Sequence, residues 1–295
     1  MSWIQITTTV PEALVEPLSE ALMAAGALSV TQAEGGQDEI FEPELGTTPL
    51  WTDTRVTGLF EADTDGQAVV RRVVAALPQL PSDQFKVEIL EDKDWVRAWM
   101  DQFQPMRFGR RLWIVPSWCE PPQPDAVNLL LDPGMAFGTG THPTTAMCLE
   151  WLDAHPPAGQ RVIDYGTGSG VLAIAAARLG ASAVHGTDID PQAITASRAN
   201  AERNGVALDL RLVQDFEADP PPPADLVMAN ILSGPLQQLA PTLCGHLRHG
   251  GSLILSGLLT EQAQSLIDTY RAHGVRLTPA ETRDGWALLA GERLG

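Results

Sequence analysis

The pattern of apolar and polar positions predicts a small α+β unit over roughly the first ninety residues. Trp3–Val10 has the pattern of a strand, and apolar residues at helical spacing predict a helix over about 12–25. A strand, a helix and a second strand are then expected over the ranges 56–62, 67–77 and 85–90. With a weakly marked second strand before them, the order β-α-β-β-α-β predicts a ferredoxin-like sandwich.

An aromatic stripe follows this unit. Trp95, Trp99 and Phe103 recur at four-residue steps, which is usual for a helix face packed on a core, and Pro105 ends the segment. Because the stripe lies between two units, we expect a linker helix. The predicted domains are therefore 1–92 (α+β unit), 93–104 (linker helix) and 105–295 (larger domain).

Strand and helix patterns alternate through the larger domain. Strands are expected over 161–164, 183–188, 208–213, 226–229, 252–256, 275–282 and 286–291. Helices are expected between them over 171–179, 191–204, 235–247 and 261–272. Such alternation predicts a doubly wound, mostly parallel sheet of seven strands with helices on both faces. The last two strands have almost nothing between them, so the final strand must be antiparallel.

Composition is that of an ordinary soluble protein. The 295 residues are 44% hydrophobic and 19% charged, and no apolar run is long enough for a membrane span. The N-terminus lacks the basic flank and apolar stretch of a signal peptide, so we expect a cytoplasmic protein that does not bind membranes. Cys119, Cys148 and Cys244 lie far apart, which indicates neither a zinc site nor disulfides.

Charge narrows the possible partners. The net charge is −18, and the first 54 residues contain nine Asp and Glu but no Lys, Arg or His. Such a surface repels phosphate, so we expect no direct binding of nucleic acid. It attracts a cationic partner, although acidity alone often serves only solubility.

The central chemical signal is a glycine-rich turn after a buried strand. Val162–Asp164 leads through Tyr165 into Gly166, Gly168 and Gly170, and a predicted helix follows. Glycine permits the sharp turn and the close approach of a ligand to the backbone. At the end of the next strand, Asp188 can bind both hydroxyls of a ribose.

Several nucleotide-type ligands use this arrangement. A dinucleotide fingerprint reads GxGxxG, but Val171 stands where its third glycine would be, and Asp164 would repel a pyrophosphate. The glycines of 134–140 are not followed by the Gly-Lys-Ser/Thr of a phosphate-binding loop. An adenosyl cofactor without a pyrophosphate, S-adenosylmethionine, fits best, with Asp164 and Gly168 near it.

A third candidate follows the fourth strand. Asn230, in Ala229-Asn230-Ile231-Leu232, is expected at the carboxyl end of a parallel strand, where ligands bind in open sheets. A lone asparagine there is more often a turn or helix cap. Alignment with the glycine turn and Asp188 at the same sheet edge favours a role in the site.

These motifs resemble the ribosomal protein L11 methyltransferases, a class I S-adenosylmethionine-dependent family, over nearly the whole chain. The segments that carry the resemblance are Leu112–Trp118, Leu131–Thr145, the glycine turn, Gly186–Asp190 and Ala229–Leu232. The long Asp-Pro-Gly…His-Pro-Thr-Thr segment is the most specific of them, because many methyltransferases lack it.

The resemblance implies the class I fold, S-adenosylmethionine as cofactor with S-adenosylhomocysteine as product, and no metal. It implies that Thr145, Gly166, Asp188 and Asn230 contact the cofactor. It further implies that the N-terminal unit grips ribosomal protein L11, free or ribosome-bound. Lysine side chains, the N-terminal amine, or both would be methylated. With no interface signal in the sequence, we expect a monomer.

Only the neutral form of an amine can accept a methyl group, although the pKa of a free lysine is about 10.4. Burial beside a positive sulfonium disfavours the ammonium, so no strong base is required. Asn230 could accept from the amine N–H or hold the cofactor. Phe137 and Trp286 could wall the methyl group or simply pack in the core, and His142 could take a proton or brace its loop.

Three other functions are weighed against this one. A small-molecule methyltransferase would need no acidic appended unit. Glutamine methyltransferases of release factors normally carry Asn-Pro-Pro-Tyr where this chain has Asn230-Ile231-Leu232-Ser233. A non-catalytic binding module would not need intact Gly166, Asp188 and Asn230.

Overall fold

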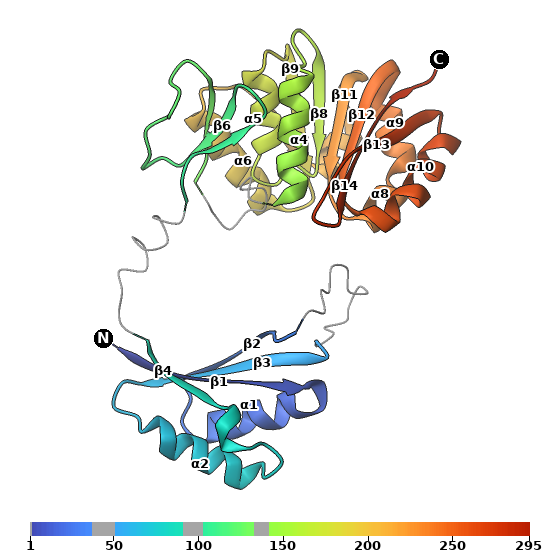
Figure 1. The fold of residues 1–295 in the computed structure, drawn as a ribbon. Helices are drawn as coiled ribbons and strands as arrows, with labels where there is room; N and C mark the ends of the chain where they lie inside the picture. Colours follow the sequence, from blue (N-terminus) through green and yellow to red (C-terminus); the bar gives the residue numbers. More distant parts are fainter. Residues whose placement is uncertain (1, 37–50, 91–102, 133–141) are drawn as a thin grey trace. The chain divides into compact units, whose positions relative to one another are not determined.

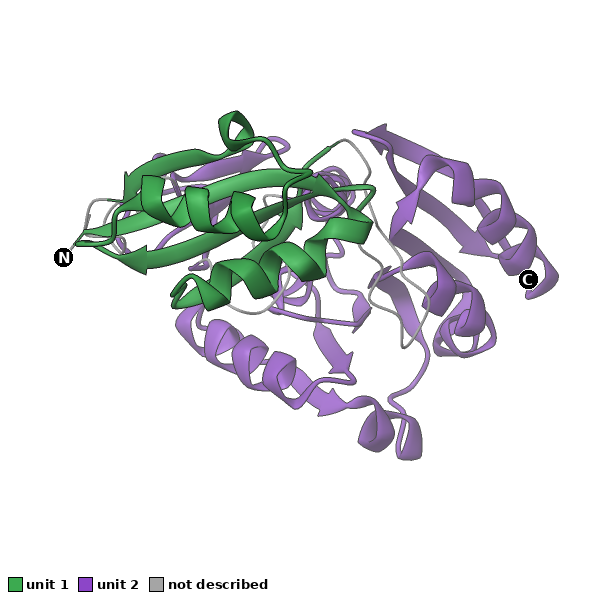
Figure 2. Ribbon diagram, turned by 90° about the horizontal axis from the view of Figure 1, so that it is seen from below, with its two compact units in different colours: residues 1–101 green, residues 102–295 purple. Residues whose placement is uncertain are grey.

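The chain forms two compact units, Met1–Asp101 and Gln102–Gly295 (Figure 2). The structure, a computed structural model, describes residues 2–36, 51–90, 103–132 and 142–295. The predicted linker helix over 93–104 lies almost wholly outside the described residues. No helix in the described ranges is long and apolar enough to cross a membrane.

The first unit has the predicted order β-α-β-β-α-β. Its elements are β1 (Trp3–Pro11), α1 (Val15–Ala24), β2 (Ser29–Glu34), β3 (Asp53–Glu61), α2 (Gly66–Ala76) and β4 (Lys86–Leu90). The sheet order is β2-β3-β1-β4 with every neighbouring pair antiparallel. The ferredoxin-like prediction is thus confirmed, including the weakly marked second strand.

Alternation along the strands builds the core of this unit. Every second residue of β1 and β3 is buried, and the apolar ones, among them Ile4, Ile6, Val56 and Phe60, form one cluster with apolar residues of both helices. Figure 1 shows α1 and α2 on the same face of this sheet. The opposite face is more polar; on it the Thr7 and Thr57 hydroxyls lie 3.1 Å apart.

The second unit is built on a seven-stranded sheet in the order β10-β9-β8-β11-β12-β14-β13. Its strands are β8 (Arg161–Tyr165), β9 (Ala183–Asp188), β10 (Asp209–Leu212), β11 (Ala224–Asn230), β12 (Leu247–Leu259), β13 (Val275–Arg283) and β14 (Trp286–Arg293). The five strands from β10 to β12 pair in parallel, whereas β14 is antiparallel to both of its neighbours. This confirms the predicted mostly parallel class I sheet with an antiparallel last strand.

Helices cover both faces of this sheet, as predicted (Figure 1). One face packs against α4 (Pro143–Ala154), α5 (Val171–Arg178) and α6 (Pro191–Arg203). The other packs against α7 (Val213–Ala218), α8 (Ser233–Gln238), α9 (Ala240–His246) and α10 (Ala263–Ala272). The sheet is therefore the shared centre of two buried apolar layers.

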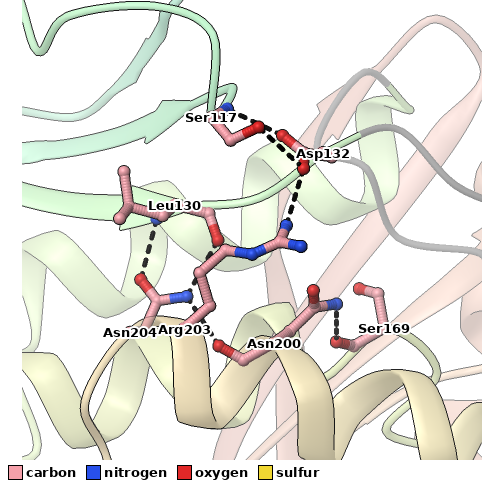
Figure 3. A network of polar contacts seen from close by, with 7 residues as sticks. All are labelled: Ser117, Leu130, Asp132, Ser169, Asn200, Arg203 and Asn204. Atoms are coloured by element: carbon pink, nitrogen blue, oxygen red, sulfur yellow. Dashed lines mark hydrogen bonds and ion pairs between the residues drawn. The ribbon is translucent and has the colours of Figure 1, made fainter.

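A three-stranded sheet, which the sequence pattern did not predict, precedes α4. It consists of β5 (Met106–Phe108), β6 (Leu112–Val115) and β7 (Val127–Leu130). Figure 3 shows how the end of α6 is joined to the end of β7: the side chain of Asn204 bonds the backbone N–H and C=O of Leu130, at 2.8 and 2.9 Å. Arg203 meets Asp132 at 2.7 Å, and Asp132 accepts from Ser117 N at 2.7 Å.

Some element boundaries were wrong. The predicted single helix over 235–247 is two helices, because Pro241 lies in the first turn of α9 and has no N–H to continue α8. The strand expected to end at residue 213 ends at Leu212, and α7 starts at Val213. The strand expected over 252–256 is the much longer β12.

Candidate cofactor and active site

The glycine-rich turn leaves the carboxyl end of β8 in an unusual backbone conformation. Gly166, Gly168 and Gly170 have φ values of 81°, 54° and 82°, in the left-handed region that favours glycine. Gly166 N and Thr167 N both donate to Thr187 O, at 2.8 and 2.9 Å, which ties the turn to β9. The turn is therefore a fixed backbone surface rather than a loose connection.

Asp164 holds the turn from beneath. Its side chain is 1% exposed, and its Oδ2 accepts from the Thr167 hydroxyl at 2.9 Å and from Ala173 N, in the first turn of α5, at 3.1 Å. Burial raises the pKa of this carboxyl to about 7, although both hydrogen bonds act to lower it. Its Oδ1 is buried without a hydrogen-bond partner. Asp164 thus joins strand, turn and helix while keeping one acceptor unused.

Asp188 lies where the sequence placed it, at the end of β9. Oδ2 accepts from Gly168 N at 2.9 Å, and Oδ1 accepts from Asp190 N at 3.0 Å. These bonds orient the carboxylate beside the glycine turn. A carboxylate has about four lone-pair sites, so two backbone bonds leave capacity for the hydroxyls of a ribose.

Asn230 is the last residue of β11, which neighbours β8 on the side opposite β9. Its Nδ2 donates to the Thr145 hydroxyl of α4 at 3.3 Å, and its Oδ1 is buried without a hydrogen-bond partner. Thr145 itself is completely buried. The structure therefore brings together two predicted site residues that are 85 positions apart in the chain, and leaves the amide oxygen of Asn230 unsatisfied.

His142 is the N-cap of α4. Its Nδ1 accepts from Thr144 N at 3.4 Å and lies 2.7 Å from the Thr144 hydroxyl. Its ring meets Trp286 of β14 edge to face, with centroids 4.8 Å apart. Burial lowers the pKa of His142, which favours the neutral imidazole. The two residues thus join the start of α4 to the closing hairpin.

Helix α6 supports the turn from a third direction. Asn200 Nδ2 donates to Ser169 O at 2.9 Å, and the neighbouring Asn204 extends the contacts to β7 (Figure 3). These supports, and the role of Thr167, were not predicted from the sequence. An asparagine pair at i and i+4 on one helix face was the available signal.

The predicted residues thus fall into three described groups and one remainder. Asp164, Gly166, Gly168 and Asp188 surround the glycine turn, whereas Thr145 and Asn230 make one contact and His142 and Trp286 another. Phe137 and the rest of the 133–141 segment lie outside the described residues.

The arrangement fits the predicted S-adenosylmethionine. The glycine turn offers a backbone without side chains, and Asp188 an oriented carboxylate. Within the described part of the chain, Oδ1 of Asp164 and Oδ1 of Asn230 are buried acceptors without a hydrogen-bond partner. Buried acceptors without partners are costly, and native proteins retain them mainly for a ligand, water or catalysis.

Comparison with known proteins agrees with this geometry. The sequence model of the family described as "Ribosomal protein L11 methyltransferase (PrmA)" matches residues 2–293. A ribosomal protein L11 methyltransferase of Hydrogenovibrio crunogenus is 57% identical over 290 residues, covering 98% of each chain. One from Pseudomonas aeruginosa is 54% identical over 294 residues, covering 99% of each chain.

A solved structure is also similar. The crystal structure of a ribosomal protein L11 methylase from Lactobacillus delbrueckii subsp. bulgaricus has 35% sequence identity and a TM-score of 0.59. The match covers 65% of this chain and 100% of that chain.

The buried Asp164 predicts a pH dependence of stability. Its folded-state pKa of about 7 lies above the unfolded value of 3.8, so between these values the folded protein holds a proton that the unfolded chain has released. The wild-type free energy of unfolding should therefore fall, relative to Asp164→Asn, as pH rises. The expected slope is roughly 1.4 kcal/mol per pH unit at most between pH 5 and 7, levelling off above. Urea unfolding of both proteins measures it.

Asp225→Asn provides the control. Hydrogen bonds from Arg161 N and Arg248 lower the pKa of Asp225, so its difference from wild type should stay flat from pH 5 to 8. A flat curve for Asp164→Asn as well would contradict the raised pKa.

Proposed function

The chain belongs to the ribosomal protein L11 methyltransferase family, and on that premise we propose that it transfers methyl groups from S-adenosylmethionine to amines of ribosomal protein L11. The acceptors would be lysine side chains, the N-terminal amine, or both. One observation carries the proposal: the buried, unpaired Oδ1 of Asn230 at the carboxyl end of β11. It is a hydrogen-bond acceptor held ready at the edge where an open parallel sheet binds its ligands.

Two groups of residues would hold the cofactor. The glycine turn from Gly166 to Gly170 offers an uncovered backbone, and Asp188, oriented by Gly168 N, would accept from both ribose hydroxyls. Thr145 would contact the cofactor next to Asn230. When bound, S-adenosylmethionine supplies an electrophilic methyl group.

Asn230 would orient the acceptor amine. Its Nδ2 is engaged by Thr145, which fixes the amide plane and leaves Oδ1 to accept an N–H of the neutral amine. That bond would aim the nitrogen lone pair at the methyl group, so the contribution is alignment rather than proton transfer.

His142 and Trp286 would shape the wall of the site. Because Nδ1 of His142 already accepts from Thr144 N, the imidazole is better placed to brace the start of α4 than to take a proton. Trp286, packed against that ring, would present an aromatic face to the positive sulfonium.

The first unit would capture the substrate protein. It carries eighteen Asp and Glu residues against six Lys and Arg within 1–101. Glu12, in the 3-10 turn that precedes α1, and Glu16 and Glu20, in α1, are exposed at four-residue steps. A negative surface of this kind attracts a basic ribosomal protein and speeds their encounter.

We further propose that the chain works in the cytoplasm as a monomer, on L11 that is free or ribosome-bound. Light scattering of the purified protein at micromolar concentration tests the monomer; a mass of twice 31.7 kDa would refute it.

Replacing Asn230 by alanine should lower kcat for methylation of L11 about 100-fold, because the amine loses its alignment. The dissociation constant for S-adenosylmethionine should change by less than about threefold, since the glycine turn and Asp188 remain. Labelled-methyl transfer and calorimetry measure the two quantities. Asn128→Ala, an asparagine of β7 that bonds its own loop carbonyls, is the control and should keep wild-type kcat. An unchanged kcat for Asn230→Ala would remove this residue from the site.

Salt should weaken the capture of L11. The Debye length falls from about 10 Å at 0.1 M to about 3 Å at 1 M, so KM for L11 should rise several-fold over that range at nearly constant kcat. The full chain carrying Glu12→Gln, Glu16→Gln and Glu20→Gln should start with a higher KM and show a shallower salt dependence. Equal salt dependence in the two proteins would rule out this helix as the attracting surface.

A further inference from the structure

Ile231, the residue after Asn230, is held between glycines of two other segments. A Cβ added to Gly166 of the glycine turn would overlap Ile231 Cγ2. A Cβ added to Gly257 of β12 would overlap Ile231 O and lie 2.8 Å from its carbonyl carbon and 3.0 Å from its nitrogen. The first contact is with a side-chain methyl, whereas the second is with backbone, which cannot rotate away.

The register of the sheet explains why Gly257 lies there. Parallel pairing of β11 with β12 ends at Asn230 opposite Ser256, so the next residues of the two chains, Ile231 and Gly257, face each other. The pairing of β12 with β14 shifts between Leu255 and Leu258. Such an irregularity bends a strand and re-aims it, and is common beside active sites.

Contacts with β14 fix the bend of β12 on the side opposite β11. Ser256 Oγ donates to Ala287 O of β14 at 3.1 Å, and Ser256 is fully buried. Gly257 itself has φ 85°, in the left-handed region. The backbone of β12 therefore cannot retreat to make room for a side chain at residue 257, and the displacement would fall on Ile231.

We infer that Gly257 is a positioning residue for methyl transfer: its missing side chain lets the backbone of β12 close against Ile231 and thereby sets the position of Asn230. The inference rests on the proposed function, in which Asn230 Oδ1 orients the amine. Asn230 is held by Thr145 through its side chain and by the β12 bend through the adjoining backbone.

Gly250 provides a matched control in the same strand. It also has a left-handed φ, of 70°, but an added Cβ would meet only Nη1 of Arg248, at 3.6 Å, which is an ordinary contact distance. Gly250→Ala thus imposes the same backbone penalty as Gly257→Ala without displacing anything. The difference between the two variants isolates the contact with Ile231.

The experiment compares both variants with wild type in the full-length protein. Gly257→Ala should lower kcat for L11 at least tenfold, because small misplacements of a reacting group are costly, while KM for L11 changes less than twofold. Gly250→Ala should keep kcat within about twofold of wild type. In ¹H–¹⁵N spectra without cofactor, the side-chain amide of Asn230, assigned with Asn230→Ala, should shift in Gly257→Ala and stay in place in Gly250→Ala.

The two readouts separate the possible failures. If the wild type does not methylate L11, the proposed function is wrong. The amide shift still shows whether Gly257 sets the position of Asn230. Equal kcat and equal spectra for the two glycine variants would overturn the inference. Should Gly257→Ala fail to fold, Ser256→Ala replaces it: removing the hydroxyl that ties the β12 bend to Ala287 O lets the backbone at Gly257 move away from Ile231 and should shift the same amide resonance, and an unmoved resonance would refute the positioning role.

Discussion

The parallel register of β9, β8 and β11 is the constraint on which the site depends. Tyr165 pairs with Thr187, and Met228 with Asp164, so the three strands end together at one edge of the sheet. Parallel strands all present their carboxyl ends on the same side, and the crevice there binds ligands in open sheets. The glycine turn directly follows β8, and Asp188 and Asn230 are the last residues of β9 and β11.

Buried polar contacts convert this shared edge into a fixed geometry. Asp164 bonds the turn and α5, Asp188 bonds the turn from β9, and Asn200 bonds it from α6. These bonds use only part of the acceptor capacity of Asp164 and Asp188, so both carboxyl groups can still accept from a ligand. Oδ1 of Asp164 and Oδ1 of Asn230 are buried without partners among the described residues, so two acceptors at this edge can still be satisfied by a ligand or water.

Much of this was predictable because it follows from local pattern. The strand ends that carry Asp188 and Asn230 and the closing antiparallel hairpin each have a direct signal in the sequence. Helix α4 has none: residues from Thr144 to Leu149 are all buried, so there is no amphipathic period to detect. Strands β5 to β7 are three or four residues long, too short for alternation to be visible.

The supporting contacts could not be predicted from the sequence, for a different reason. The bond from Asn230 to Thr145 and the contact of Gly257 with Ile231 join segments 85 and 26 residues apart, and no single segment encodes either of them. Thr145 was identified only through the family resemblance. Phe137 stays a prediction, because it lies outside the described residues.

Mass spectrometry of purified ribosomal protein L11, after incubation with this protein and S-adenosylmethionine, tests the central claim most directly. We expect mass gains in steps of one methyl group on amines, and their loss with Asp188→Ala, which removes the carboxylate beside the glycine turn. No gain from a wild-type protein that still binds S-adenosylmethionine by calorimetry would contradict the proposed substrate.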